Sequence, residues 1–168
     1  SKRPMKLSVC ISCSFLFLTN SVMADPPEPG EKSLKLATQK AAAEFVEDYY
    51  EQAAIGLSDE DLDRYYTSQK LRRHDTLVQR LAYVTGQNTD IEQRRILDTE
   101  RMNALCEKLT LQKLNTTGAA TRKAELRYSV TNNCVDYPPK LKRKIALFYS
   151  TDFDQWQIHR VSDWEIHE

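Results

Sequence analysis

The chain has 168 residues, which is enough for one domain of ordinary size and too few for two well-formed ones. Lys and Arg together number 24, as do Asp and Glu, so the formal net charge is zero. A chain-wide positive field that would attract nucleic acid or an anionic membrane is therefore excluded.

Residues 1–24 have the pattern of a secretory signal peptide. Basic residues precede an apolar run over residues 7–18, and Val22 and Ala24 supply the small side chains that a signal peptidase requires. Residues 1–4 stand before Met5 and are interpreted as non-native or upstream residues. The run is shorter than the roughly 20 residues that cross a bilayer. We expect an exported protein in the periplasm of a Gram-negative bacterium, without stable membrane insertion; the alternative is a retained membrane anchor.

Residues 25–33 are predicted to form a flexible linker, because this stretch is rich in proline and charge and has little to bury. A single domain over 34–168 follows. Its first half has helical periodicity, with a first helix from near Leu34 to a stop at Gly56. Ser58 is placed to cap a second helix, and Gly86 to end a third. Thr89 and Glu92 suggest a capping box for a further helical segment.

The second half changes to the two-residue period of strands. Apolar residues alternate cleanly with polar ones over 124–131, and shorter alternating runs occur at 109–111, 144–150 and from Trp156 onward. The alternation slips late in the chain, which predicts a bulge near residues 160–162. Helices followed by an antiparallel meander predict an α+β domain, with helices packed on one face of a curved sheet of about four strands.

Two segments carry a resemblance to a known family. FVEDYYEQAAIGLSDEDLDRYY resembles the opening helices of the nuclear-transport-factor-2-like (cystatin-like) superfamily, and DFDQWQIHRVSDWEI is similar to the final strand of its sheet. The resemblance spans about residues 34–168 and implies a strongly bent, cone-like sheet around the helices. The superfamily includes isomerases and cyclases that work inside the cone, and also non-enzymatic periplasmic domains. The resemblance therefore does not determine a function.

Cys106 and Cys134 are the cysteines that remain after signal removal, and an oxidising compartment favours a disulfide between them. Simple hairpin pairing would put the two on opposite sides of the sheet. Either a bulge shifts the register, or Cys134 lies beyond the end of its strand and reaches back; free thiols or an intermolecular bridge are the alternative.

Aromatic and basic residues are the remaining candidates for a site. Five aromatics are candidates to line a cone cavity: Tyr49, Tyr50, Tyr65, Tyr66 and Trp156. At helical spacing we expect one tyrosine of each pair to pack on the sheet and the other to face outward. Four basic residues precede or open the third strand and form either a solvated strand edge or a docking patch for an acidic partner: Lys140, Lys142, Arg143 and Lys144.

No catalytic residue, metal ligand set or cofactor motif is predicted. The three histidines are far apart in sequence, and the four glycines have no phosphate-binding spacing. Our first hypothesis is a non-enzymatic binding or assembly domain that contacts a protein partner, such as an envelope or secretion-complex component or a toxin it neutralises, with a homo-oligomer as a further option. The alternative is an isomerase or cyclase acting on a small apolar ligand in the cone.

Overall fold

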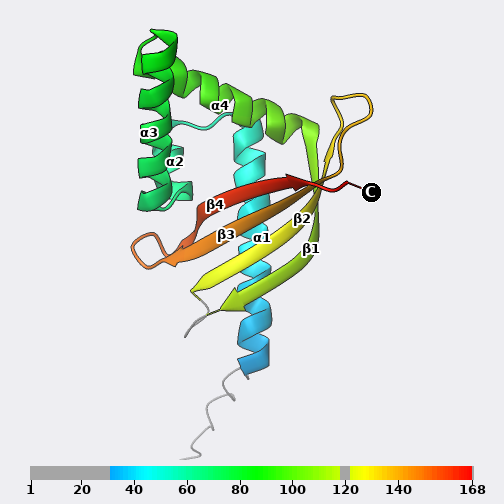
Figure 1. Ribbon diagram of the computed structural model, residues 1–168. Coiled ribbons are helices and arrows are strands. Elements are labelled where there is room, and N and C mark those ends of the chain that lie inside the picture. Colours follow the sequence, from blue (N-terminus) through cyan, green and yellow to red (C-terminus); the bar gives the residue numbers. More distant parts are fainter. Residues whose placement is uncertain (1–30, 118–121, 168) are drawn as a thin grey trace, which may run out of the picture.

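The computed structural model describes residues 31–117 and 122–167, and the side chains from Thr38 onward. The predicted signal peptide, and the predicted linker up to Gly30, lie outside these residues. Four helices come first: α1 (Glu31–Ile55), α2 (Asp59–Tyr65), α3 (Ser68–Thr85) and α4 (Thr89–Cys106). Four strands follow: β1 (Glu107–Thr117), β2 (Lys123–Asn132), β3 (Leu141–Ser150) and β4 (Gln155–Glu165) (Figure 1). Helix α1 thus begins three residues before the helix that the sequence predicts.

Local capping chemistry sets most of the helix boundaries. The Ser58 side chain accepts a hydrogen bond from the Asp61 amide, and the Asp61 carboxylate accepts one from the Ser58 amide, so a complete capping box starts α2. Gly86 ends α3 with a φ of 71°, in the left-handed region that glycine adopts without strain.

The predicted cap of the fourth helix is off by one residue. Asn88, not Thr89, caps α4 by accepting from the Ile91 amide. Glu92 does not reach back to the cap. Its side chain is buried and accepts a hydrogen bond from the Thr85 hydroxyl at 2.9 Å, which ties the start of α4 to the end of α3.

The sheet is an antiparallel meander in the order β1-β2-β3-β4. Two residues are left unpaired by shifts in register, Gln112 in β1 and His159 in β4. The second shift confirms that the last strand is irregular, but it lies just before the predicted 160–162. The sheet is curved and does not close, so the architecture is the α+β arrangement predicted from the change of period.

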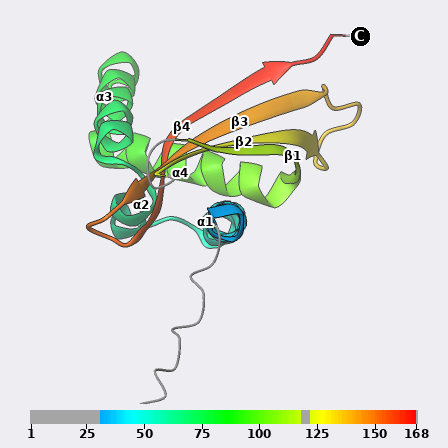
Figure 2. The same cartoon turned by 90° about the horizontal axis from the view of Figure 1, so that it is seen from below.

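One face of the sheet carries the core. The alternating side chains of β2 and β3 that point to this face are almost fully buried: Ala124, Leu126, Tyr128, Val130, Ile145 and Leu147. Figures 1 and 2 show α1 against this face, with α4 packed on α1 and α3 beyond the β4 edge. Backbone pairing of Tyr66 with Ile158 fixes the end of α2 to β4. The opposite face is not covered by any of the described helices, and we call it the outer sheet face.

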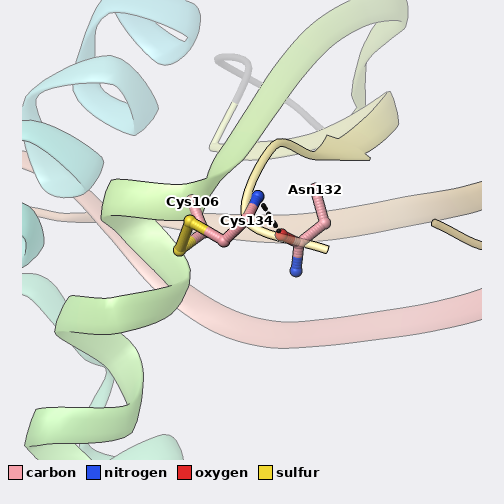
Figure 3. The surroundings of a disulfide bond; sticks show 3 residues. All are labelled: Cys106, Asn132 and Cys134. Atoms are coloured by element: carbon pink, nitrogen blue, oxygen red, sulfur yellow. Dashed lines mark hydrogen bonds between the residues drawn. A yellow bond between two sulfur atoms is a disulfide. The ribbon is translucent and has the colours of Figure 1, made fainter. Parts of the chain in front are cut away.

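The disulfide joins the two ends of the first hairpin (Figure 3). Cys106 is the last residue of α4, and Cys134 lies two residues beyond β2, with a Cα–Cα distance of 5.3 Å. The Asn133 amide also donates to the Cys106 carbonyl at 2.7 Å. Of the two predicted ways to bring the cysteines together, a bulge or a Cys134 beyond the strand end, the second is correct, because Cys134 reaches back from beyond the end of β2.

Candidate functional site

A groove of about 420 Å³ runs between α1 and the edge strand β1. Its helical wall is a stripe with the three- and four-residue spacing of one helix face, consisting of Ala43, Val46, Glu47, Tyr50, Glu51 and Ala54. Leu109 and Leu111 of β1 form the other wall, and Tyr128 of β2 lies between the two. The groove ends at Ala104, Glu107 and Lys108, where α4 joins β1. The groove is therefore apolar along the β1 wall, and it carries polar side chains along the rim of α1 and where α4 joins β1.

Charge along the groove is predominantly negative. Glu47 and Glu51 lie one helical turn apart on α1, and both are exposed. Lys108 borders the groove at the junction of α4 and β1, but by strand register its side chain points to the outer sheet face. A ligand would therefore meet two solvated carboxylates on the helical rim.

Two residues of the groove lining, Tyr50 and Glu107, belong to a buried ionic network centred on Arg143 of β3. The guanidinium donates to Glu107 from Nη1 and Nη2, at 2.6 Å and 3.2 Å, and to Asp163 from Nε and Nη2, at 2.7 Å and 2.8 Å. Nη1 also donates to the Tyr50 hydroxyl at 3.2 Å. One side chain thus joins α1, β1, β3 and β4, and two carboxylates held in bidentate geometry neutralise it.

The protonation of Arg143 follows from these contacts. Burial by itself would lower the pKa of the guanidinium, but the hydrogen bonds to Asp163 and Glu107 outweigh burial and raise its pKa. Arg143 is therefore a permanent cation here. Because Glu107 already accepts two of its hydrogen bonds, this carboxylate is a structural partner of Arg143 rather than a free base in the groove.

A second polar cluster fills the space between α1, α2 and α4. The hydroxyls of Tyr49 and Tyr66 lie 3.0 Å apart, and Tyr49 donates to Glu100 of α4 at 3.5 Å. The Lys70 ammonium sits 4.5 Å from the centre of the Tyr66 ring. Tyr65, one residue earlier, donates instead to Asp48 at 2.9 Å. Each of these buried tyrosines thus has a partner for its hydroxyl.

Burial makes the tyrosines in and around the groove poor bases. It raises the pKa of Tyr50 to about 12, although Arg143 lowers the pKa in part. Burial is also the largest cause that raises the pKa of Tyr49, Tyr66 and Tyr128. All four hydroxyls are protonated at neutral pH, so they can donate hydrogen bonds but cannot abstract a proton.

The structure places the five predicted cavity residues differently from the prediction. Only Tyr50 lines the groove. Tyr49, Tyr65 and Tyr66 are buried in the core, and Tyr50 is half-buried with its hydroxyl on Arg143, so the expectation that one tyrosine of each pair faces outward is wrong for both pairs. Trp156 is also a core residue, packed edge-on against Tyr149 with ring centres 5.5 Å apart.

The predicted basic patch is divided between the two faces of the sheet. Arg143 is only 6% exposed and points toward the helices, so it is not part of a surface patch. Lys142 and Lys144 alternate with it and lie on the outer sheet face. Strand β3 is also internal to the sheet, so the interpretation of this run as a solvated edge is wrong.

The histidines do not converge. The His74 ring contacts Gln93, and His159 Nδ1 lies 3.2 Å from the Thr67 hydroxyl while its ring stacks on Phe148. His167 is exposed near the end of the chain. Among residues 31–117 and 122–167, no three His, Cys, Asp or Glu side chains are grouped closely enough to hold a metal ion. No helix in the same part of the chain is both long and apolar enough to span a membrane.

Comparison of the chain with protein-family models, with curated proteins and with solved structures finds no match. The resemblance to the nuclear-transport-factor-2-like superfamily therefore stays a prediction. The function has to be argued from the groove, the network beneath it and the uncovered face of the sheet.

Sequence reasoning missed Glu107 and Asp163, the two partners of Arg143. A usable signal was present in β3, where Arg143 has the same parity as Ile145 and Leu147 and so belongs to the buried face. An arginine in that position requires a buried acceptor. Which carboxylates supply it depends on the pairing of β3 with β4 and on the approach of β1, and neither can be read from a local pattern.

Proposed function

We propose that the protein is a non-enzymatic binding domain of the periplasm, and that the groove between α1 and β1 accepts an extended segment of a protein partner. An envelope or secretion-complex component and a toxin are both partners of this kind. The groove carries the proposal because its β1 wall is apolar, it lies along an edge strand, and Tyr50 and Glu107 in its lining are already bonded to Arg143.

The edge strand supports binding of a polypeptide in particular. Among the described strands none pairs with the side of β1 that faces away from β2, and an incoming chain can pair with the backbone groups there. Leu109 and Leu111 project into the groove from alternate positions of this strand. A segment with apolar residues at alternate positions would fill the groove, and a basic residue would meet Glu47 and Glu51 on the rim.

The periplasmic location is supported by the leader pattern and by the disulfide. A bond between Cys106 and Cys134 is stable in an oxidising compartment. The bond joins the end of α4 to the first hairpin next to the groove residue Glu107, and so holds the Glu107 region in place.

A small-molecule enzyme is the alternative, and the volume of the groove is the observation that favours it. A space of about 420 Å³ falls within the range of ligand pockets. Against this alternative, the tyrosine hydroxyls are protonated and Glu107 is occupied by Arg143, so abstraction of a proton from a substrate would depend on the exposed Glu47 or Glu51.

Photo-crosslinking from inside the groove tests the proposal. A benzophenone side chain is placed at Ala54, which lines the groove, and in a matched variant at Ala41, which is exposed on the same helix outside it. Each protein is irradiated in a concentrated extracytoplasmic extract of its source. We expect a discrete polypeptide adduct from position 54 alone, which is lost when Ala43→Trp fills the groove.

The captured segment is then synthesised and titrated by calorimetry, and Ala43→Trp should weaken its binding by at least about tenfold, the loss of roughly 1.4 kcal/mol. Adducts of equal intensity from both positions would contradict the groove as the binding site. An adduct of a few hundred daltons from position 54 would instead establish the small-molecule alternative.

A further inference from the structure

The outer sheet face is strongly basic although the whole chain is neutral. By the strand register, seven Lys and Arg side chains point to this face: Lys108, Lys113, Lys123, Arg127, Lys142, Lys144 and Arg160. Of the acidic residues within the four strands, only Glu125 shares it. Glu107 and Asp163 point to the other face, toward Arg143, and Glu165 alternates in step with Asp163. The sheet therefore separates charge between its two sides.

Three of these cations form a row across the middle of the face. Lys113 pairs with Arg127, and Arg127 pairs with Lys144, so the three stand opposite one another on three adjacent strands. We call them the cation row. Arg127 has a carboxylate partner in Glu125, with Nη2 and Oε1 3.1 Å apart. Lys113 and Lys144 have no carboxylate within salt-bridge distance among the described residues.

Like charges directly opposite one another lower the stability of the sheet, and the fold does not need them at these positions. Directly opposed residues on antiparallel strands interact, and like charges there are destabilising. The outer face needs only polar residues to stay soluble, and Thr110, Ser129 and Ser162 serve that purpose on neighbouring positions. The positive field also reaches His159, whose pKa is lowered by burial and further by Arg73, Arg160, Lys123 and Lys70.

The spacing and the surroundings of the cation row favour an acidic helix as its ligand over nucleic acid or a membrane. Nucleic-acid binding normally goes with a basic domain, whereas the calculated pI of this chain is about 6.8. Adhesion to a membrane requires several apolar side chains that insert beside the cations; on this face Phe148 is stacked on His159, and the exposed Trp164 stands opposite Lys142 rather than in the row. Neighbouring strands are about 4.8 Å apart. Carboxylates three or four residues apart on a helix have Cβ atoms about 5–6 Å apart, so an acidic helix lying across the strands matches the row.

We propose that the outer sheet face docks an acidic helical segment of another protein across the cation row of Lys113, Arg127 and Lys144. This site is on the opposite side of the sheet from the groove and does not depend on the function proposed for the groove. Contact with three carboxylates would relieve the repulsion within the row and complete the ion pairs that Lys113 and Lys144 lack within the described residues.

Designed peptides supply a defined probe. An alanine-rich helical peptide carries four glutamates on one face at positions i, i+4, i+7 and i+11, and its isomer carries the same four glutamates distributed around the helix. Both are labelled with fluorescein and titrated with the purified protein at about 50 mM and 150 mM salt, on either side of the range where screening becomes strong. Anisotropy reports binding.

The protein is compared with two triple variants of equal charge. K113Q/R127Q/K144Q removes the row, and R72Q/R80Q/R94Q removes three exposed arginines from α3 and α4. We expect the one-faced peptide to bind more tightly than its isomer and more tightly at low salt. Removing the row should weaken its binding by at least about tenfold, and removing the helical arginines by less than about twofold.

Four outcomes would overturn the proposal. They are equal binding of the two peptides, an equal loss in the two triple variants, and no binding of the one-faced peptide at either salt concentration. The fourth is a cation row that serves another ligand while the peptide does not bind. The protein would then co-sediment with vesicles containing 30% phosphatidylglycerol, or self-associate at low salt, and the row variant K113Q/R127Q/K144Q would lose that behaviour.

Discussion

Replacement of Arg143 by methionine tests the ionic network on which the geometry of the groove depends. The side chain of Arg143 is 7% exposed and that of Glu107 8% exposed, whereas that of Asp163 is 38% exposed. After the substitution Asp163 can regain water, but Glu107 remains a buried carboxylate without its cation. Removal of one partner from a buried pair typically costs 3–5 kcal/mol, and because Asp163 is partly solvated we expect about 3 kcal/mol.

Urea unfolding at pH 7 measures this cost. A domain of this size has an m-value of roughly 1.5–2 kcal/mol/M, so the midpoint of Arg143→Met should fall by about 1.5–2 M. The matched control is Lys144→Met, the same substitution at the next residue of β3. Lys144 lies on the outer face in a row of like charges, so its replacement should be neutral or slightly stabilising.

A double-mutant cycle separates loss of the pair from a general packing defect. Glu107→Gln removes the buried charge, so when it is added to Arg143→Met it should restore about 1–2 kcal/mol of the lost stability. If the double variant were destabilised by the sum of the two single effects, or if Arg143→Met cost less than about 1 kcal/mol, the network would not be the structural centre described above.

Two further predictions concern the disulfide and the tyrosines. Reduction of the Cys106–Cys134 bond, with a sequence separation of 28, should lower the free energy of unfolding by about 3.5 kcal/mol on the chain-entropy model, and the variant C106A/C134A should unfold at the same urea concentration with and without reductant. Because burial raises the pKa of Tyr50 from 10.0 to about 12, the folded state binds more protons than the unfolded state above pH 10, and stability should fall as the pH rises from 10 to 12. Urea unfolding at pH 9, 10 and 11 should show this fall, with a shallower slope in Tyr50→Phe; an equal slope in that variant would mean that Tyr50 ionises as readily in the folded protein as in the unfolded one.

The sequence predicts correctly those features that depend on contacts within a single helix or strand. The change from helical to alternating periodicity places the boundary between helices and sheet near Cys106, because each pattern describes a single element against a common core. Ser58 and Gly86 mark helix ends because capping is a contact within a few residues. The disulfide also followed from the count of cysteines and the expected compartment.

Local sequence patterns do not predict the groove and its ionic network, because these are formed by elements that come together only in the folded domain. The groove requires α1 to cross β1 at a distance that leaves a space, and periodicity says nothing about that distance. Because its residues are adjacent in sequence, the basic run suggests a single patch, but adjacent residues of a strand point to opposite faces. Arg143 and Lys144 thus belong to two different surfaces with opposite chemistry.

The buried network also gives a physical reason why the groove stays open. Between α1 and the sheet the core is closed by apolar side chains such as Val46 and Leu126, but at one end the helix meets β3 through Tyr50 and Arg143. A guanidinium held by two bidentate carboxylates resists displacement, because any shift would leave a buried charge unpaired. Helix α1 is therefore kept at a fixed distance at that end and cannot close onto β1. A partner would find the walls of the groove already in place, and the cost of organising them would have been met during folding.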